Sequence, residues 1–154
     1  MARSRHKGNR IDGPFLALPR DLIDHPAFLR LSPHAKALLI DLGTQYRGDN
    51  NGDLACAWKL MKPRGWRSEA TLHKAKQELL HAEFIFEARK GRRPNVCSLF
   101  ALTWLAIDAS PKHDCSPAAF VRGAYRLKDP VPLLRVALVG GAVLTPPRGV
   151  ARAA

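Results

Sequence analysis

Apolar residues recur at helical spacing in two stretches of the chain, and the first, "LSPHAKALLIDLGTQY", covers residues 31–46. Its apolar positions repeat every three or four residues, as on one side of an α-helix. They are Ala35, Leu38, Leu39, Leu42 and Tyr46. Ser32 is a residue type suited to the N-cap, and Pro33 suits the first helical position, where its missing N–H costs no hydrogen bond. The pattern predicts a helix that begins at Pro33 and presents this apolar stripe to a core.

The second amphipathic stretch, "RGWRSEATLHKAKQELLHAEFI", covers residues 64–85. Ser68 is the expected N-cap of a helix whose apolar and polar residues fall on opposite sides at about 100° per residue. The apolar side carries Leu72, Ala75, Leu79 and Leu80, and the polar side carries Ala70, Lys74, Gln77 and His81. Lys76 falls inside the apolar stripe. Its stem is expected to cover the core while its ammonium reaches water, unless the helical phase differs by one residue.

A turn and a shorter helix are expected between these two helices. "RGDNNGD", residues 47–53, contains glycines and asparagines that suit a tight turn. "LACAWKLM", residues 54–61, predicts a helix that ends near Pro63, which cannot continue one. Two helices joined by a short turn are the frame of a helix-turn-helix, whose second helix presents its outer face to the major groove of DNA.

A β-hairpin is predicted directly after the last helix. "FIFEAR", residues 84–89, and "VCSLFALTW", residues 96–104, are rich in aromatic and β-branched residues, and "KGRRPN" between them suits a turn. The turn and its start are basic, with Arg89, Lys90, Arg92 and Arg93. Three helices followed by a hairpin predict an α+β fold, a winged helix, over residues 14–106.

Two flanking segments lack this periodic pattern. Residues 1–13, "MARSRHKGNRIDG", are expected to form a flexible basic arm, or only a solubilising tail. Residues 107–154 are expected to form a partly irregular extension with a short helix near Phe120 to Arg126. A chain that ends near Ala109 is therefore predicted to keep its core.

The chain is strongly basic. It has 154 residues, with 25 Lys and Arg against 13 Asp and Glu, and this surplus favours a polyanionic partner such as nucleic acid or an anionic membrane surface. Half of the surplus of 12 falls between residues 59 and 93, which hold ten basic and four acidic residues. A solvated basic face of an ordinary helix and hairpin is the alternative interpretation.

The candidate DNA-binding residues are those of the second helix, the hairpin and the arm. The helix N-terminus offers N–H groups to a phosphate, and its polar side chains can reach base edges. The full set is Arg67, Ser68, Ala70, Thr71, His73, Lys74, Gln77, Arg89, Lys90, Arg92, Arg93, Arg3, Arg5 and Lys7.

Other chemistry finds little support in the sequence. Trp58 and Trp104 lie in apolar patterns and are expected in the core, whereas Trp66 could be buried or could stack on a base. The cluster of ligand-type residues "KHDC" at 112–115 lacks a second pair of ligands, and "RGDNNGD" lacks the spacing of a calcium loop, so neither a metal nor a cofactor is expected. Phosphate-binding and hydrolase motifs do not occur, which predicts a protein that is not an enzyme.

Cysteine content and hydropathy predict a cytoplasmic protein without a membrane segment. Three scattered cysteines do not suggest a disulfide framework, and no secretory leader opens the sequence. The longest apolar run, "VPLLRVALVGGAVL" at 131–144, is too short to span a bilayer and is interrupted by Arg135 and two glycines.

The segment from Ser68 to Ile85 and the basic hairpin after it resemble the recognition helix and wing of bacterial winged helix-turn-helix proteins. The shared features are the cap serine, the Thr71–Leu72 pair and a closing small-x-Phe-Ile. The span from Phe15 to Trp104 is similar to small helix-turn-helix proteins of proteobacterial phages, prophages and plasmids. This sequence departs from them at Glu83, where many of these proteins have a glycine that ends the helix.

The resemblance implies a protein that binds double-stranded DNA as a transcriptional regulator or a replication-associated factor. The alternative is a phage-type interaction module that binds and inhibits a host nucleoprotein or defence complex. Basic charge favours the first, because a protein that mimics DNA would be acidic. A homodimer could form through Phe15 to Leu31 or through the segment after Asp108.

Overall fold

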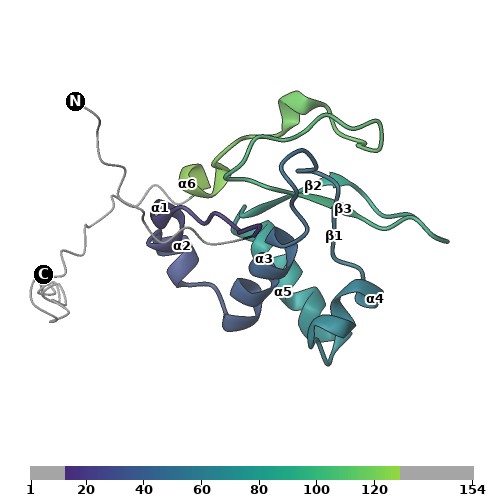
Figure 1. Cartoon of the computed structure of the whole chain (residues 1–154), viewed down its shortest axis with the longest axis horizontal. Helices are drawn as coiled ribbons and strands as arrows, with labels where there is room; N and C mark the ends of the chain where they lie inside the picture. The colour runs from purple at the N-terminus through teal and green to yellow at the C-terminus, as the bar shows by residue number, and fades with distance from the viewer. Residues whose placement is uncertain (1–12, 129–154) are drawn as a thin grey trace, which may run out of the picture.

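The computed structural model describes residues 13–128, which form a mixed α+β fold with six α-helices and one small antiparallel sheet (Figure 1). The α-helices are α1 (Arg20–Ile23), α2 (Pro26–Leu29), α3 (Pro33–Gly43), α4 (Trp58–Met61), α5 (Glu69–His81) and α6 (Ala124–Lys128). The strands are β1 (Leu54–Ala55), β2 (Ile85–Arg89) and β3 (Leu99–Leu102), and two 3₁₀ turns are η1 (Lys62–Arg64) and η2 (Pro117–Ala119). The predicted basic arm and the apolar run 131–144 lie outside these residues. None of the described helices is long and apolar enough to cross a membrane.

Helix α3 begins where the sequence predicts. The Ser32 hydroxyl accepts a hydrogen bond from the Ala35 N–H at 3.2 Å, and Pro33 occupies the first turn. Four residues of the predicted stripe, Ala35, Leu38, Leu39 and Leu42, are buried. Tyr46 lies beyond the end of the helix and packs against the same core while partly exposed.

Helix α5 also has the predicted cap and phase. The Ser68 hydroxyl accepts the Thr71 N–H at 3.3 Å. Leu72, Ala75 and Leu79 are buried, and Leu80 is partly buried. The four residues predicted for the polar side are all exposed. Lys76 is half-buried, as a side chain must be when its stem covers the core and its ammonium reaches water.

The helix predicted over residues 54–61 is wrong in its first half. Leu54 and Ala55 form β1 and pair with Phe100 and Leu99 of β3. The Gln45 side chain bonds the other side of Ala55, since its amide donates to the Ala55 C=O at 2.9 Å and its oxygen accepts the Ala55 N–H at 3.0 Å. These partners come from distant parts of the chain, so the local pattern gave no sign of the strand.

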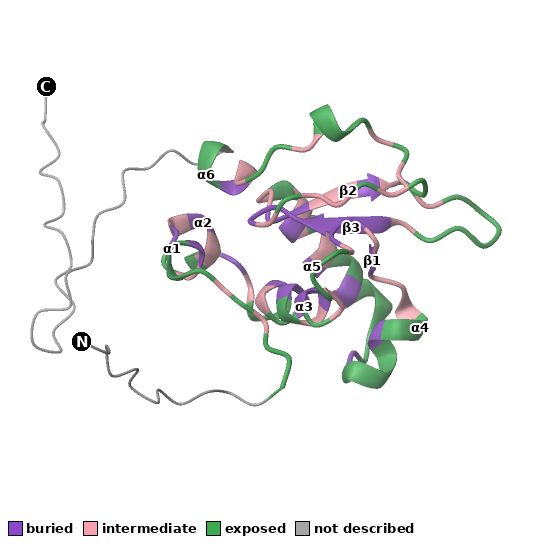
Figure 2. Cartoon of the chain, turned by 45° about the horizontal axis from the view of Figure 1, so that its top comes forward, coloured by how far each residue is buried: buried purple, intermediate pink, exposed green. Residues whose placement is uncertain are grey.

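The sheet has the order β1-β3-β2, and the predicted hairpin is confirmed in β2 and β3. All four residues of β3 are buried, because both faces of the sheet are covered (Figure 2). Phe100 and Leu102 belong to the core beneath the helices. Figure 1 shows residues 107–121 running over the opposite face of the sheet. There the ring of Phe120 meets that of Phe86 at 5.5 Å.

Residues 107–128 are part of the packed unit, so the domain does not end at residue 106 as the sequence analysis expects. Tyr125 is fully buried and stacks on Phe84, with ring centroids 4.9 Å apart. The Gly123 N–H donates to the Thr103 C=O at 2.6 Å, and the Asp114 N–H donates to the Ala88 C=O at 3.0 Å. The helix expected near Phe120 to Arg126 is α6, which begins at Ala124. A single aromatic residue after an irregular stretch produces no periodic pattern, so the sequence did not predict that Tyr125 belongs to the core.

Replacing Tyr125 by alanine should lower the free energy of unfolding by about 3–5 kcal/mol, as for other buried aromatic side chains. Tyr125→Phe is the matched control. The Tyr125 hydroxyl is buried without a hydrogen-bond partner among the described residues, so its removal should be nearly neutral. Urea denaturation of the two variants measures both values. A loss for Tyr125→Ala below about 0.5 kcal/mol would place the ring at the surface.

The stability of the protein should also fall between pH 7.5 and pH 5.5 because of His25. Its buried ring caps α2, where Nδ1 accepts the Ala27 N–H at 3.2 Å and so must be unprotonated. Burial, and then the positive charges of Arg126 and Arg30, lower the pKa of His25 below 6.5. The unfolded chain therefore binds this proton more readily than the folded chain, and stability is lost as the pH drops through 6.5.

The variant His25→Asn keeps a capping oxygen but does not titrate. It should show a smaller loss of melting temperature between pH 7.5 and pH 5.5 than the unmodified protein. His73→Asn, at an exposed position, is the control and should retain the full loss. Equal losses in both variants would contradict the assignment to His25.

Candidate nucleic-acid interface

The outer face of α5 is the centre of the candidate interface. Ala70, His73, Lys74 and Gln77 are exposed there, on the side of the helix opposite its buried residues. Thr71 is different, because it is half-buried and lines a hollow between α5 and α3. The α5 residues of the predicted interface, apart from Thr71, therefore form one solvent-facing strip.

The N-terminal end of α5 is anchored to α3 through one carboxylate. Asp41 accepts hydrogen bonds from the Trp66 indole N–H at 2.8 Å and from the Arg64 Nε at 2.7 Å. Trp66 is only 8% exposed and belongs to the hydrophobic core. The ambiguity over Trp66 is resolved in favour of burial, so its ring is not free to stack on a base. Arg67 and Ser68, which follow it, are exposed.

A second carboxylate anchors the C-terminal half of α5. Glu78 accepts both the backbone N–H and the hydroxyl of Ser32, each at 2.6 Å. Ser32 is also the N-cap of α3, so α5 is tied to the start of that helix. With one anchor near each end, the helix cannot easily roll on α3, and the direction in which its outer face points is fixed.

The hairpin tip carries three positively charged side chains close together in the sequence. Lys90, Arg92 and Arg93 are exposed, and the Arg92–Val96 backbone pair closes the loop with two hydrogen bonds of 2.9 Å. The Arg92 guanidinium also lies 3.9 Å from Asp114, a long contact between exposed side chains that contributes little. These three cations project into solvent.

Arg89 differs from its neighbours in the predicted set. Its guanidinium donates to the Cys97 C=O across the hairpin, at 3.3 Å from Nε and 3.0 Å from Nη2. The side chain thus braces the two strands where they part. Because its donors are engaged with the backbone, Arg89 is better suited to shaping the hairpin than to gripping a ligand.

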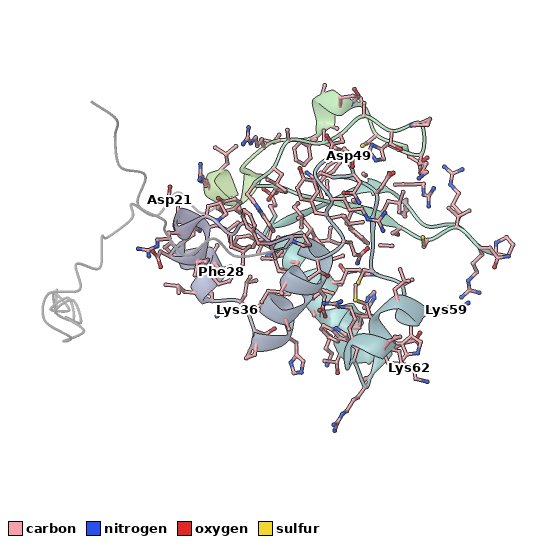
Figure 3. The ribbon with its side chains drawn as sticks, in the orientation of Figure 1. Asp21, Phe28, Lys36, Asp49, Lys59 and Lys62 are labelled. Carbon is pink, nitrogen blue, oxygen red and sulfur yellow. The ribbon has the colours of Figure 1, made fainter. Side chains whose placement is uncertain are left out.

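Two further lysines lie at the same end of the molecule. Figure 3 places Lys59 and Lys62, of α4 and η1, below the hairpin tip, and both are exposed. A hollow between the start of α4 and the first turns of α5 has a lining that includes Trp58, Ala70 and His73. Both lysines belong to the basic surplus of residues 59–93, but the sequence does not mark them as site residues, because a helix of one turn has too few residues to show its outward side.

Three predicted contacts cannot be placed. Arg3, Arg5 and Lys7 lie outside the described residues. The remaining candidates are exposed on α5, in the turn before it and at the hairpin tip, except that Thr71 is turned toward α3 and Arg89 is held within the hairpin.

The groups that could suggest other chemistry are engaged in packing. Burial raises the pKa of the Cys56 thiol to about 11, so this side chain is a neutral thiol at pH 7. His113 lies 3.1 Å from Asp53 through Nε2, and Lys112 bonds the other oxygen of that carboxylate at 3.2 Å. Within residues 13–128, no three ligand-type side chains gather as a metal site would require.

Removal of the Asp41 carboxylate should destabilise the protein, because it leaves the Trp66 N–H buried without an acceptor. Asp41→Ala is expected to lower the free energy of unfolding by about 1–3 kcal/mol in urea denaturation. Asp49→Ala, at an exposed turn position, is the control and should change it by less than about 0.5 kcal/mol. If both variants behave alike, the anchor does not hold the start of α5.

Comparisons with protein-family models, curated proteins and solved structures found no match to this chain. The resemblance to winged helix-turn-helix proteins therefore stays a prediction.

Proposed function

We propose that this protein binds double-stranded DNA through a winged helix-turn-helix and acts as a transcriptional regulator or replication-associated factor. The observation that carries the proposal is that the polar face of α5 and the basic tip of the hairpin that follows it are both exposed. Neither element needs such a surface for packing, since the apolar side of α5 and the strands of the hairpin already supply the core.

The order of the elements supports the winged-helix interpretation. A helix, a short strand, a helical turn, a second long helix and a hairpin follow one another as α3, β1, α4, α5 and β2–β3, with β3 between the other two strands. In such an arrangement α5 is the recognition helix and the β2–β3 loop is the wing. The anchors from Asp41 and Glu78 would keep the recognition helix at a fixed angle to the rest of the domain.

Different side chains would perform different parts of recognition. His73, Lys74 and Gln77 have the donors and acceptors needed to read base edges in a major groove. Arg92 and Arg93 on the wing would contact phosphates, which adds affinity without adding sequence information. Lys59 and Lys62 would contact DNA phosphates next to the recognition helix. The hydrogen bonds of Arg89 assign it to the support of the wing.

Two pairs of substitutions separate these roles. Arg92→Ala with Arg93→Ala should weaken binding to all duplexes and reduce the slope of log K against log salt by about one unit per lost contact. Lys74→Ala and Gln77→Ala should each cost about 1–3 kcal/mol on the preferred sequence and leave binding to scrambled duplexes nearly unchanged. Fluorescence anisotropy at several salt concentrations measures both effects, after selection of a preferred site from a random duplex library.

Arg20→Ala with Arg30→Ala is the matched control for charge, because these residues lie in α1 and at the end of α2, away from the hairpin. This pair should change affinity much less than the wing pair. If the unmodified protein binds duplex DNA no better than a basic protein of equal charge, the DNA proposal fails. A partner captured from host lysate that survives nuclease treatment would then favour the protein-binding alternative.

A further inference from the structure

An apolar groove follows the outer edge of β2, the strand at one side of the sheet. Its lining includes Leu80, Ile85, Phe86, Val121, Ala124 and Leu127. Val121 and Leu127 expose 48% and 70% of their surfaces, and both lie on the wall that leads into α6. Neighbouring apolar residues that are left this open indicate a surface that another segment covers.

The backbone of β2 is also open along the first part of this edge, before Ala88, whose C=O accepts the Asp114 N–H. The Thr103 N–H donates to the Phe84 C=O at 3.1 Å, which sets the alternation of the hairpin ladder. Because the alternate residues of an antiparallel strand direct their polar groups to opposite sides, Ile85 and Glu87 direct theirs away from β3 and toward the groove. No strand pairs with β2 on this side within residues 13–128. Such an edge is suited to the addition of a strand.

A segment of the same chain has the composition and the position to fill this groove. Residues 131–139, "VPLLRVALV", are apolar except for Arg135. The described chain ends at Lys128, next to Leu127 in the groove wall. The chain from the end of α6 at Lys128 to Val131 can span up to about 10 Å when extended, so the segment begins close to the groove wall at Leu127.

The charges at the groove match this segment. Arg135 is the single charged residue between Asp129 and Arg148. Glu83 and Glu87 line the groove, and neither forms an ion pair in the part of the chain that the structure describes. A charge that enters an apolar groove requires a partner of opposite sign, and these carboxylates provide it.

We propose that residues 131–139 dock in this groove as an added strand along β2, with Arg135 facing Glu83 and Glu87. The docked segment covers Val121 and Leu127 and closes the free edge of the sheet. This interaction does not depend on DNA binding. The occupant is the chain's own segment rather than that of a second copy, because the short connection from Leu127 makes the intramolecular contact far more concentrated than an intermolecular one.

Hydrogen–deuterium exchange of the full chain, read by mass spectrometry, tests the docking. Peptides that cover residues 84–89 and 131–139 should both be protected in the unmodified protein. Arg135→Glu should speed their exchange about tenfold or more, because it places a third carboxylate in the groove. Arg148→Glu makes the same change of charge beyond the segment and should leave both peptides protected. The double variant Glu87→Arg with Arg135→Glu should restore protection.

Peptides from α3 serve as an internal reference, since their unchanged exchange shows that each variant is folded. The proposal is overturned if residues 131–139 of the unmodified protein exchange as fast as an unstructured peptide. Equal effects of Arg135→Glu and Arg148→Glu would also overturn it. Light scattering after gel filtration should show a monomer with protection independent of concentration, whereas protection confined to a dimer would assign the groove to a second copy.

Discussion

Two carboxylates, one on each long helix, fix the packing of α3 against α5, and the placement of the whole polar face depends on them. Asp41 of α3 reaches the turn before α5, where it accepts from Trp66 and Arg64, and Glu78 of α5 reaches Ser32 at the start of α3. Each helix thus holds the segment that leads into the other. Apolar packing alone would allow the helices to roll, because leucine contacts are not directional. Charge-assisted hydrogen bonds at two separate points restrict that motion.

A buried asparagine fixes the position of the sheet's neighbouring segments by hydrogen bonds in a similar way. Asn51 is fully buried, and its side chain bonds the N–H and C=O of Leu102 and the C=O of Ala106 at 2.7–3.0 Å. Its backbone exchanges two hydrogen bonds with Asp108, so the turn at 47–53 is joined to the end of β3 and to the segment that crosses the sheet. Loss of this one side chain would leave three backbone groups without partners. The segment 107–121 can therefore cover the sheet with only the short 3₁₀ turn η2 as secondary structure of its own.

The features that the sequence predicted are those that local chemistry determines. The caps at Ser32 and Ser68, the buried faces of α3 and α5 and the β2–β3 hairpin each depend on residues close together in the chain. Glu83 has a positive φ of 59°, the left-handed conformation that a glycine commonly supplies after a helix, so the backbone turns there as it would with a glycine. Strand β1, the burial of Trp66 and the role of Tyr125 escaped prediction, because each depends on a partner more than ten residues away. For the candidate site, exposure could be predicted from the helical phase, but the engagement of Arg89 with Cys97 could not.

The hairpin carries opposite charges at its two ends, and this polarity connects the two surfaces proposed for the protein. Glu83 and Glu87 lie near the start of β2, while Lys90, Arg92 and Arg93 lie at the tip. A nucleic acid would be attracted to the tip and repelled from the base of the hairpin, so the acidic residues would help to orient a duplex on the wing rather than along the sheet edge. Arg135 of the docked segment would neutralise part of that repulsion. Because β2 links the two regions directly, a strand added along its edge would also stiffen the support of the wing. Strand β2 would then influence both the position of a bound nucleic acid and the mobility of the hairpin tip.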